Sequence, residues 1–172
     1  MQSEYNDDIN VCLHNYKKLC KWGKYVNILE CDYVAIPINQ NNHWSLIMIV
    51  NPRSLKNVFG NVSSEVSETN SFPKIIYFDS FFPDNEYCMK VIKRFLVMEY
   101  HRKMENSFLC KGNMEFNEII TEIESKMKAY YPKVPNQNNT YDCGIYLLTY
   151  AELFFNNPDY ILSQLDKSVN ND

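Results

Sequence analysis

The chain has 172 residues, of which 45% are hydrophobic and 15% aromatic, so it is long enough for one domain with a sizeable core. Its formal net charge of −4 argues against a general nucleic-acid-binding protein, which is usually basic. No apolar run approaches the roughly 20 residues that a membrane-spanning helix needs, and the acidic N-terminus differs from signal and transit peptides. We therefore expect a soluble, intracellular protein.

The cysteines show no CxxC pair, and this spacing argues against a structural zinc site. Without a secretory signal, reduced thiols are the expectation, so we predict neither a disulfide framework, nor a metal, nor any other cofactor. One cysteine in distinctive surroundings is then the feature to look for. The six cysteines are Cys12, Cys20, Cys31, Cys88, Cys110 and Cys143.

Hydrophobic periodicity predicts short strands followed by helices. The predicted strands lie at 33–38, 43–50 and 74–78, with a polar turn at 39–42. The predicted helices lie at 8–21, 84–105 and 116–130, and a last one runs from Pro158 or Asp159 to about Leu165 before a frayed tail. Pro37 indicates an edge or terminal strand position, because proline cannot donate a ladder hydrogen bond.

Two further segments carry expectations about burial. Residues 52–73 contain few large apolar residues and are predicted to be a mobile loop or insertion. On the helix at 84–105 one face is predicted to be buried, and the charged residues are placed elsewhere. The buried face is Tyr87, Val91, Phe95 and Met98, and the charged residues are Lys90, Lys93, Arg94 and Glu99.

Chemical signals are densest between Tyr131 and Phe155. Prolines keep the first part extended, a polar loop follows, and Asp142 stands at the N-cap of an apolar helix. Cys143 therefore falls in the first helical turn, where the helix dipole favours thiolate over thiol. On its own, a cysteine near a helix start is more often simply a small buried hydrophobic residue.

Three histidines are available as a base, and His14 and His101 both fall on helical segments with ordinary explanations. His43 heads a buried strand, and Asp79 ends a strand that is predicted to pair beside it. Taken alone, the histidine also fits a strand end bonded to a carbonyl, and the aspartate fits a turn. Together with Cys143 they offer a nucleophile, a base and a group that orients the base. Gln137 can offer an amide N–H to an oxyanion.

Three blocks, HWSLIMIV, IIYFDS and NQNNTYDCGIYLLTYAE, resemble the signatures of the ubiquitin-like-protein-specific cysteine proteases, the Ulp/SENP or sentrin-specific family. The resemblance covers roughly residues 31–160. It implies one α+β domain over 1–172 with the papain-like fold of this family, a central mixed sheet and the nucleophile at a helix N-terminus. The implied site residues are Cys143 as nucleophile, His43 as base, Asp79 as its orienter, Gln137 as oxyanion donor and Trp44 as roof of a channel for a Gly-Gly tail.

The implied function is hydrolysis of the bond after the C-terminal Gly-Gly of SUMO, by a nuclear or nucleocytoplasmic monomer that binds SUMO or another ubiquitin-like modifier and its conjugates. The blocks and the insertion resemble the Ulp2-like branch. The Trp-Leu-Asn-Asp segment usual upstream in the family is not matched before Asp32, so either the chain begins inside the domain or the lineage has diverged. The alternatives are a catalytically impaired modifier-binding domain and a protease for another modifier or a plain peptide bond.

Overall fold

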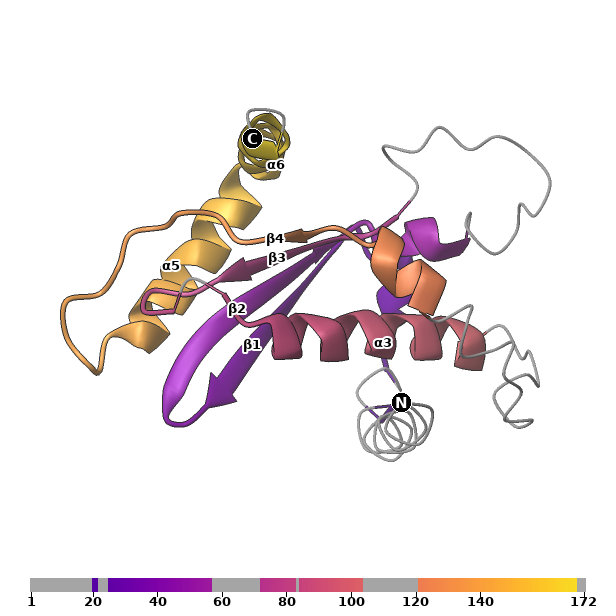
Figure 1. Ribbon diagram of the computed structural model, residues 1–172, viewed down its shortest axis with the longest axis horizontal. Helices are drawn as coiled ribbons and strands as arrows, with labels where there is room; N and C mark the ends of the chain where they lie inside the picture. Colours follow the sequence, from indigo (N-terminus) through magenta and orange to yellow (C-terminus); the bar gives the residue numbers. More distant parts are fainter. Residues whose placement is uncertain (1–19, 22–24, 57–71, 83, 104–120, 170–172) are drawn as a thin grey trace. The chain divides into compact units, whose positions relative to one another are not determined.

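The computed structural model describes residues 20–21, 25–56, 72–82, 84–103 and 121–169 (Figure 1). They fall into two compact units. One holds the described parts of Met1–Asp32, Asn51–Pro73 and Glu86–Lys128, and the other holds those of Tyr33–Val50, Lys74–Asn85 and Ala129–Asp172. The predicted helix at 8–21, apart from its last two residues, lies outside the described residues. Among the described helices, none is both long and apolar enough to cross a membrane.

The second unit is built on a four-stranded mixed sheet in the order β1-β2-β3-β4. β1 (Tyr33–Gln40), β2 (His43–Val50) and β3 (Lys74–Phe78) pair antiparallel, and β4 (Ala129–Tyr130) pairs parallel to β3. β1 is an edge strand, as Pro37 predicted. β2 and β3 have the predicted bounds, because short apolar runs between polar turns leave little freedom in where a strand starts.

The turn between β1 and β2 is shorter than predicted. Asn39 and Gln40 belong to β1 and pair with Trp44 and His43, so the turn is Asn41–Asn42 alone. Both have positive φ, 53° and 61°, which asparagine tolerates better than most residues. Two residues in this conformation match the twist of the two strands, so the hairpin closes tightly and fixes His43 at the start of β2.

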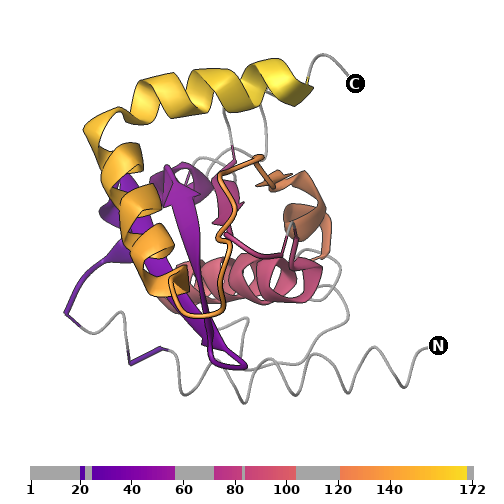
Figure 2. The same cartoon turned by 90° about the vertical axis from the view of Figure 1, so that its left-hand side faces the viewer.

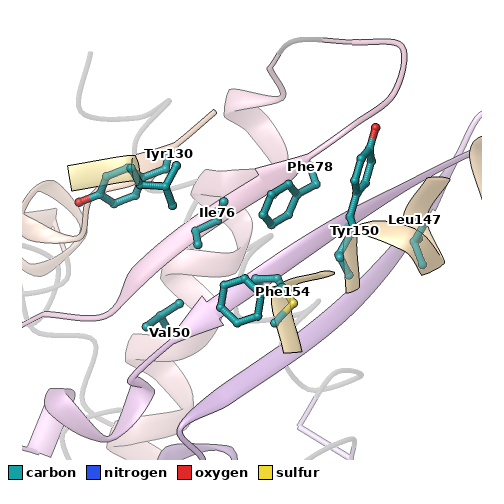
Figure 3. Packing of buried hydrophobic residues seen from close by; sticks show 10 residues of the cluster. Val50, Ile76, Phe78, Tyr130, Leu147, Tyr150 and Phe154 are labelled. Atoms are coloured by element: carbon teal, nitrogen blue, oxygen red, sulfur yellow. The ribbon is translucent and has the colours of Figure 1, made fainter. Parts of the chain in front are cut away.

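Two helices cover the sheet of this unit, α5 (Cys143–Asn156) and α6 (Pro158–Val169). The chain bends at Asn157 between them (Figure 2). Apolar side chains from β2, β3, β4 and both helices form one buried cluster (Figure 3). Its buried members are Leu46, Met48, Val50, Ile76, Phe78, Tyr130, Leu147, Tyr150, Phe154 and Leu165.

Several predicted helix limits were wrong. Residues 121–126 are helical, but Ala129 and Tyr130 form β4 because they pair with Ile75 and Ile76 of β3. α6 continues to Val169, past the predicted end at Leu165. Buried Leu165 anchors its later turns to the core. The predicted loop at 52–73 begins with a 3₁₀ helix, η3 (Pro52–Ser54), and residues 57–71 lie outside the described residues.

In the first unit, α3 (Glu86–Lys103) lies within the helix predicted at 84–105. The side-chain prediction for it was partly wrong, since Tyr87 is exposed and Glu99 is fully buried. Glu99 is compatible with burial because both its carboxylate oxygens accept hydrogen bonds from Arg102. The side chain of His101 lies outside what the structure describes, as does His14.

Candidate active site

His43 and Asp79, the candidate base and its candidate orienter, come from the ends of neighbouring strands. Leu46 of β2 pairs with Phe78 of β3, so the start of β2 and the residues after β3 lie side by side. Successive strand residues point to opposite faces, which separates His43 and Ser45 from Trp44 and Leu46. His43 and Asp79 meet on the first of these faces, with Nε2 of the imidazole 2.7 Å from Oδ1 of the carboxylate.

Asp79 is enclosed by donors. Its Oδ1 accepts from Nε2 of His43 and from the backbone N–H groups of Phe81 and Phe82, at 2.7 and 2.9 Å. Its Oδ2 accepts from the hydroxyl of Tyr77 at 2.7 Å. The side chain is 1% exposed, so this carboxylate is held in one orientation by four hydrogen bonds. Because a carboxylate only accepts, Nε2 carries the imidazole proton and Nδ1 is the basic nitrogen.

Tyr77 is a site residue that the sequence reasoning missed. Burial raises its pKa to about 12, and the hydrogen bond to Asp79 acts in the same direction. The phenol therefore keeps its proton at neutral pH and can donate it to Asp79. The signal in the sequence was weak, because a tyrosine two residues before Asp79 in an apolar strand is explained equally well by packing.

Gln137 lies where the sequence predicted, at the end of the extended approach to α5. Its backbone N–H donates to the carbonyl of Ser80 at 3.0 Å, and its side-chain Oε1 accepts from the Ser80 hydroxyl at 2.6 Å. One Nε2 hydrogen is donated to the carbonyl of Asn139 at 2.6 Å. The residue is buried, and the second hydrogen of the amide has no partner among the described residues.

Tyrosines of α5 hold this approach segment in place. The Tyr150 hydroxyl donates to the carbonyl of Pro135 at 2.6 Å, and the Tyr146 hydroxyl donates to that of Asn136 at 3.2 Å. Burial raises the pKa of Tyr150 to about 12, so this donor is also kept protonated. The loop that carries Gln137 is thereby tied to the helix that carries Cys143.

Cys143 opens α5 and is 5% exposed. Asp142 occupies the N-cap position as predicted, but the expected side-chain cap is absent. Its carboxylate instead accepts from the amide of Asn139 at 2.6 Å, while its backbone carbonyl accepts from Ile145 and Tyr146. In the described part of the chain, the backbone N–H groups of Cys143 and Gly144 have no partner, as is usual for a first helical turn.

Trp44 links the two halves of the site. It is 41% exposed, and a Cβ on Gly144 would lie 3.9 Å from its ring. Trp44, which follows His43, therefore lies beside Gly144, which follows Cys143. The structure pairs His43 with Asp79 directly, and among the described residues Sγ of Cys143 makes no hydrogen bond to the imidazole.

Such an arrangement suits nucleophilic acyl transfer. A thiol at a helix N-terminus gains from the helix dipole when it ionises, and a histidine oriented by a carboxylate can accept its proton. Unpaired N–H groups at the helix start can bind an oxyanion. His/Cys/Asp/Glu clusters suited to holding a metal ion do not occur among the residues described.

A model of the family described as "Ulp1 protease family, C-terminal catalytic domain" matches residues 5–171. The chain is 26% identical over 190 residues to Sentrin-specific protease 7 of Mus musculus, covering 91% of this chain and 18% of that protein. It is 31% identical over 140 residues to Probable ubiquitin-like-specific protease 2A of Arabidopsis thaliana, covering 81% and 16%. The chain thus spans less than a fifth of the length of either relative.

A solved structure described as the crystal structure of the de-sumoylating protease superposes with a TM-score of 0.63 at 24% identity. The match covers 89% of this chain and 49% of that one. At this identity the likeness concerns the fold, and it confirms the predicted α+β architecture with a central mixed sheet.

Proposed function

This chain belongs to the Ulp1 protease family, as its three sequence blocks predicted, and we propose that it is a SUMO-specific cysteine protease. It hydrolyses the isopeptide or peptide bond after the C-terminal Gly-Gly of SUMO. In this proposal residues 1–172 act as one monomeric protease domain with an insertion at 52–73, in the nucleus or in both nucleus and cytoplasm. A fluorescent fusion of the full-length protein tests the location.

The observation that carries the proposal is the His43–Asp79 pair. Four donors fix the carboxylate, one of them Nε2 of His43, so Nδ1 is left as the nitrogen that can exchange a proton with Cys143. An imidazole held in one tautomer and one orientation is what a cysteine protease requires of its base. A purely structural histidine at a strand end needs only a single acceptor.

The reaction proceeds through an acyl-enzyme. The Cys143 thiol gives its proton to Nδ1 of His43, and the thiolate attacks the carbonyl carbon of the terminal glycine. The oxyanion accepts hydrogen bonds from the Cys143 backbone N–H and the second Nε2 hydrogen of Gln137. When the tetrahedral intermediate collapses, the C–N bond breaks and His43 passes its proton to the departing lysine amine. Water, deprotonated by His43, then releases the modifier as a carboxylate and restores the thiol.

Substrate selection in this proposal depends on Trp44. Its exposed ring beside Gly144 roofs the path to Cys143, and only glycine, which lacks a Cβ, fits such a narrow path twice in succession. The names of the two relatives, a sentrin-specific and a ubiquitin-like-specific protease, agree with a modifier of this type. A panel of modifiers with C-terminal electrophiles separates SUMO from the other ubiquitin-like proteins.

Cys143→Ala is expected to abolish cleavage of a SUMO–lysine conjugate and to leave the fold intact, because the side chain is small and α5 keeps its packing. Cleavage is followed by gel shift, and folding by circular dichroism. Cys88→Ala is the matched control: burial raises the pKa of the Cys88 thiol, so that cysteine stays protonated and its loss leaves turnover unchanged. Unchanged cleavage by Cys143→Ala would refute the proposal.

One observation favours a second candidate, a modifier-binding domain without turnover. In the described part of the structure no hydrogen bond joins Sγ of Cys143 to the imidazole of His43. A catalytically impaired site would lack this hydrogen bond as well. SUMO with a C-terminal electrophile decides between the two. Covalent capture that Cys143→Ala eliminates supports the protease, whereas tight but wholly reversible binding supports the binding domain.

A further inference from the structure

A cavity of about 340 Å³ lies beside His43. All of its described lining residues belong to the unit that carries His43 and Cys143. Gln137, the candidate oxyanion donor, contributes to the wall as well. The cavity therefore adjoins His43 and Gln137, two groups that the proposed reaction needs. No part of the substrate has so far been assigned to it.

The cavity and Trp44 lie on opposite sides of the start of β2. His43 and Ser45, which share one face of the strand, both line the cavity. Trp44 points to the other face, where it lies beside Gly144. Gln40 is the cross-strand partner of His43 and also lines the cavity, as expected for a pair whose side chains share a face.

This division matches the two products of the reaction. The glycine tail of the modifier runs along Trp44, so the acyl part of the substrate occupies that side. His43 must reach the leaving amine to protonate it. On the face of β2 opposite Trp44, the open space beside His43 is this cavity. The leaving lysine is thus the part of the substrate that the cavity can hold.

Much of the wall is polar, and no Asp, Glu, Lys or Arg is among its described residues. Carboxamides from Gln40, Asn41, Asn42 and Asn85 line one part, and the amide of Asn85 donates to Oε1 of Gln40 at 3.3 Å. Each carboxamide carries both a donor and an acceptor, which is the complement of a peptide main chain.

Two aromatic rings complete the wall. Phe81 and Phe82 are about half exposed, and the Phe82 ring meets the His43 ring edge-on at 5.4 Å. Their faces suit the methylene stem of a lysine that approaches His43. The backbone N–H groups of both residues donate to Asp79, so the backbone that carries the two rings is held beside His43.

We propose that this cavity is the leaving-side subsite, which takes the lysine stem and the adjoining main chain of the conjugated protein. The inference rests on the proposed function. In this inference the enzyme recognises the conjugated protein through main-chain hydrogen bonds and apolar contact with the lysine stem. The charge of the residues that flank the lysine therefore has little influence on the rate of cleavage.

The test compares two leaving groups on the same modifier. One substrate is SUMO joined to a lysine-containing peptide, and the other is SUMO ending in an aminocoumarin amide, which has neither a lysine stem nor a peptide main chain. The variant is Gln40→Ala with Asn42→Gly, since glycine accepts the positive φ of 61° at position 42. Gln164→Ala, an exposed carboxamide on α6, is the matched control.

We expect the ratio of kcat/KM for the peptide conjugate to kcat/KM for the aminocoumarin amide to fall about 10-fold in the variant, because two hydrogen bonds to the leaving group are lost. The ratio in Gln164→Ala stays at the wild-type value. An unchanged ratio in the variant overturns the inference even if both rates fall. If the wild-type protein cleaves neither substrate, the proposed function itself has failed.

A second measurement tests the absence of charge selection. Conjugates whose lysine is flanked by alanine, aspartate or arginine are expected to be cleaved within about threefold of one another, because no Asp, Glu, Lys or Arg is among the described residues that line the cavity. A preference of 10-fold or more for one charge overturns recognition through the main chain.

Discussion

Among single residues, Asp79 uses each of its carboxylate oxygens differently. Oδ1 binds the imidazole and two backbone N–H groups, while Oδ2 accepts a hydrogen bond from the hydroxyl of Tyr77, its single partner among the described residues. Without the tyrosine, the buried Oδ2 would have no partner among the described residues. Tyr77 therefore fixes the rotation of the carboxylate and, through it, the plane of His43.

Tyr77→Phe is expected to lower kcat for SUMO–lysine cleavage by roughly 10-fold and to leave KM unchanged, because a hydrogen bond to a charged group is worth about 1.5–3 kcal/mol. The ring and its packing remain, so only the orientation of Asp79 and of the His43 imidazole changes. Steady-state kinetics at neutral pH measure both constants. Tyr160→Phe, at an exposed position on α6, is the control, and a rise in KM with normal kcat would contradict the positioning role.

Sequence reasoning reached some of these residues and not others. His43, Asp79 and Cys143 could be singled out because each is a reactive residue type at the end of a predicted element. The hydroxyl contact of Tyr77 and the Ser80–Gln137 bond could not be predicted, since both depend on which side chains the strand register and the approach loop bring together. Local patterns carry no information on that pairing.

Among the elements, α6 shows which interactions hold a helix to the sheet. Leu165 is buried in the core, and its neighbour Asp166 makes an ion pair with Lys74 at 2.8 Å. The Asp166 side chain is 51% exposed, so water screens most of this attraction. Burial of the leucine is therefore the larger contribution, although the ion pair is the more obvious contact.

Leu165→Ala is expected to lower the free energy of unfolding by about 2–5 kcal/mol, the usual range for a truncated core leucine. Asp166→Asn keeps the size of the side chain and should lower it by no more than about 1 kcal/mol. Urea titrations followed by tryptophan fluorescence compare the two variants directly. Equal losses would show that the ion pair, rather than the buried leucine, anchors α6.

Strands were predicted more accurately than helix ends. β2 and β3 are bounded by abrupt changes from apolar to polar residues, which a local reading detects. Ala129 and Tyr130 follow a helical pattern and were predicted to end the helix at 116–130. They form β4 instead, because β3 is available as a parallel partner. That partner lies more than fifty residues earlier in the sequence, so no local window contains it.

For the whole molecule, buried tyrosines link stability to alkaline pH. The pKa values of Tyr77 and Tyr150 are both raised from 10.0 to about 12, chiefly by burial. Below pH 10 both phenols are protonated whether the chain is folded or unfolded, and their contribution is fully present. Between pH 10 and 12 the unfolded chain releases protons that the folded chain retains, so the free energy of unfolding falls.

We expect the urea midpoint to decrease progressively as the pH rises above 10. A Tyr77→Phe/Tyr150→Phe variant, which lacks both phenols, should show a shallower decrease over the same range. The comparison uses the slope against pH and not the absolute midpoint, so a general loss of stability in the variant does not affect it. Equal slopes would mean that other groups dominate the alkaline response.

The order of the candidate site residues along the sequence has a consequence during translation. His43 begins β2 and Asp79 follows β3, whereas the candidate nucleophile Cys143 begins α5, which is translated later. At about 5–20 residues per second, roughly 3–13 s separate the translation of Asp79 from that of Cys143. Under the proposed mechanism, a growing chain therefore contains both His43 and Asp79 before it contains the candidate nucleophile, so it is incapable of the reaction until Cys143 has been translated.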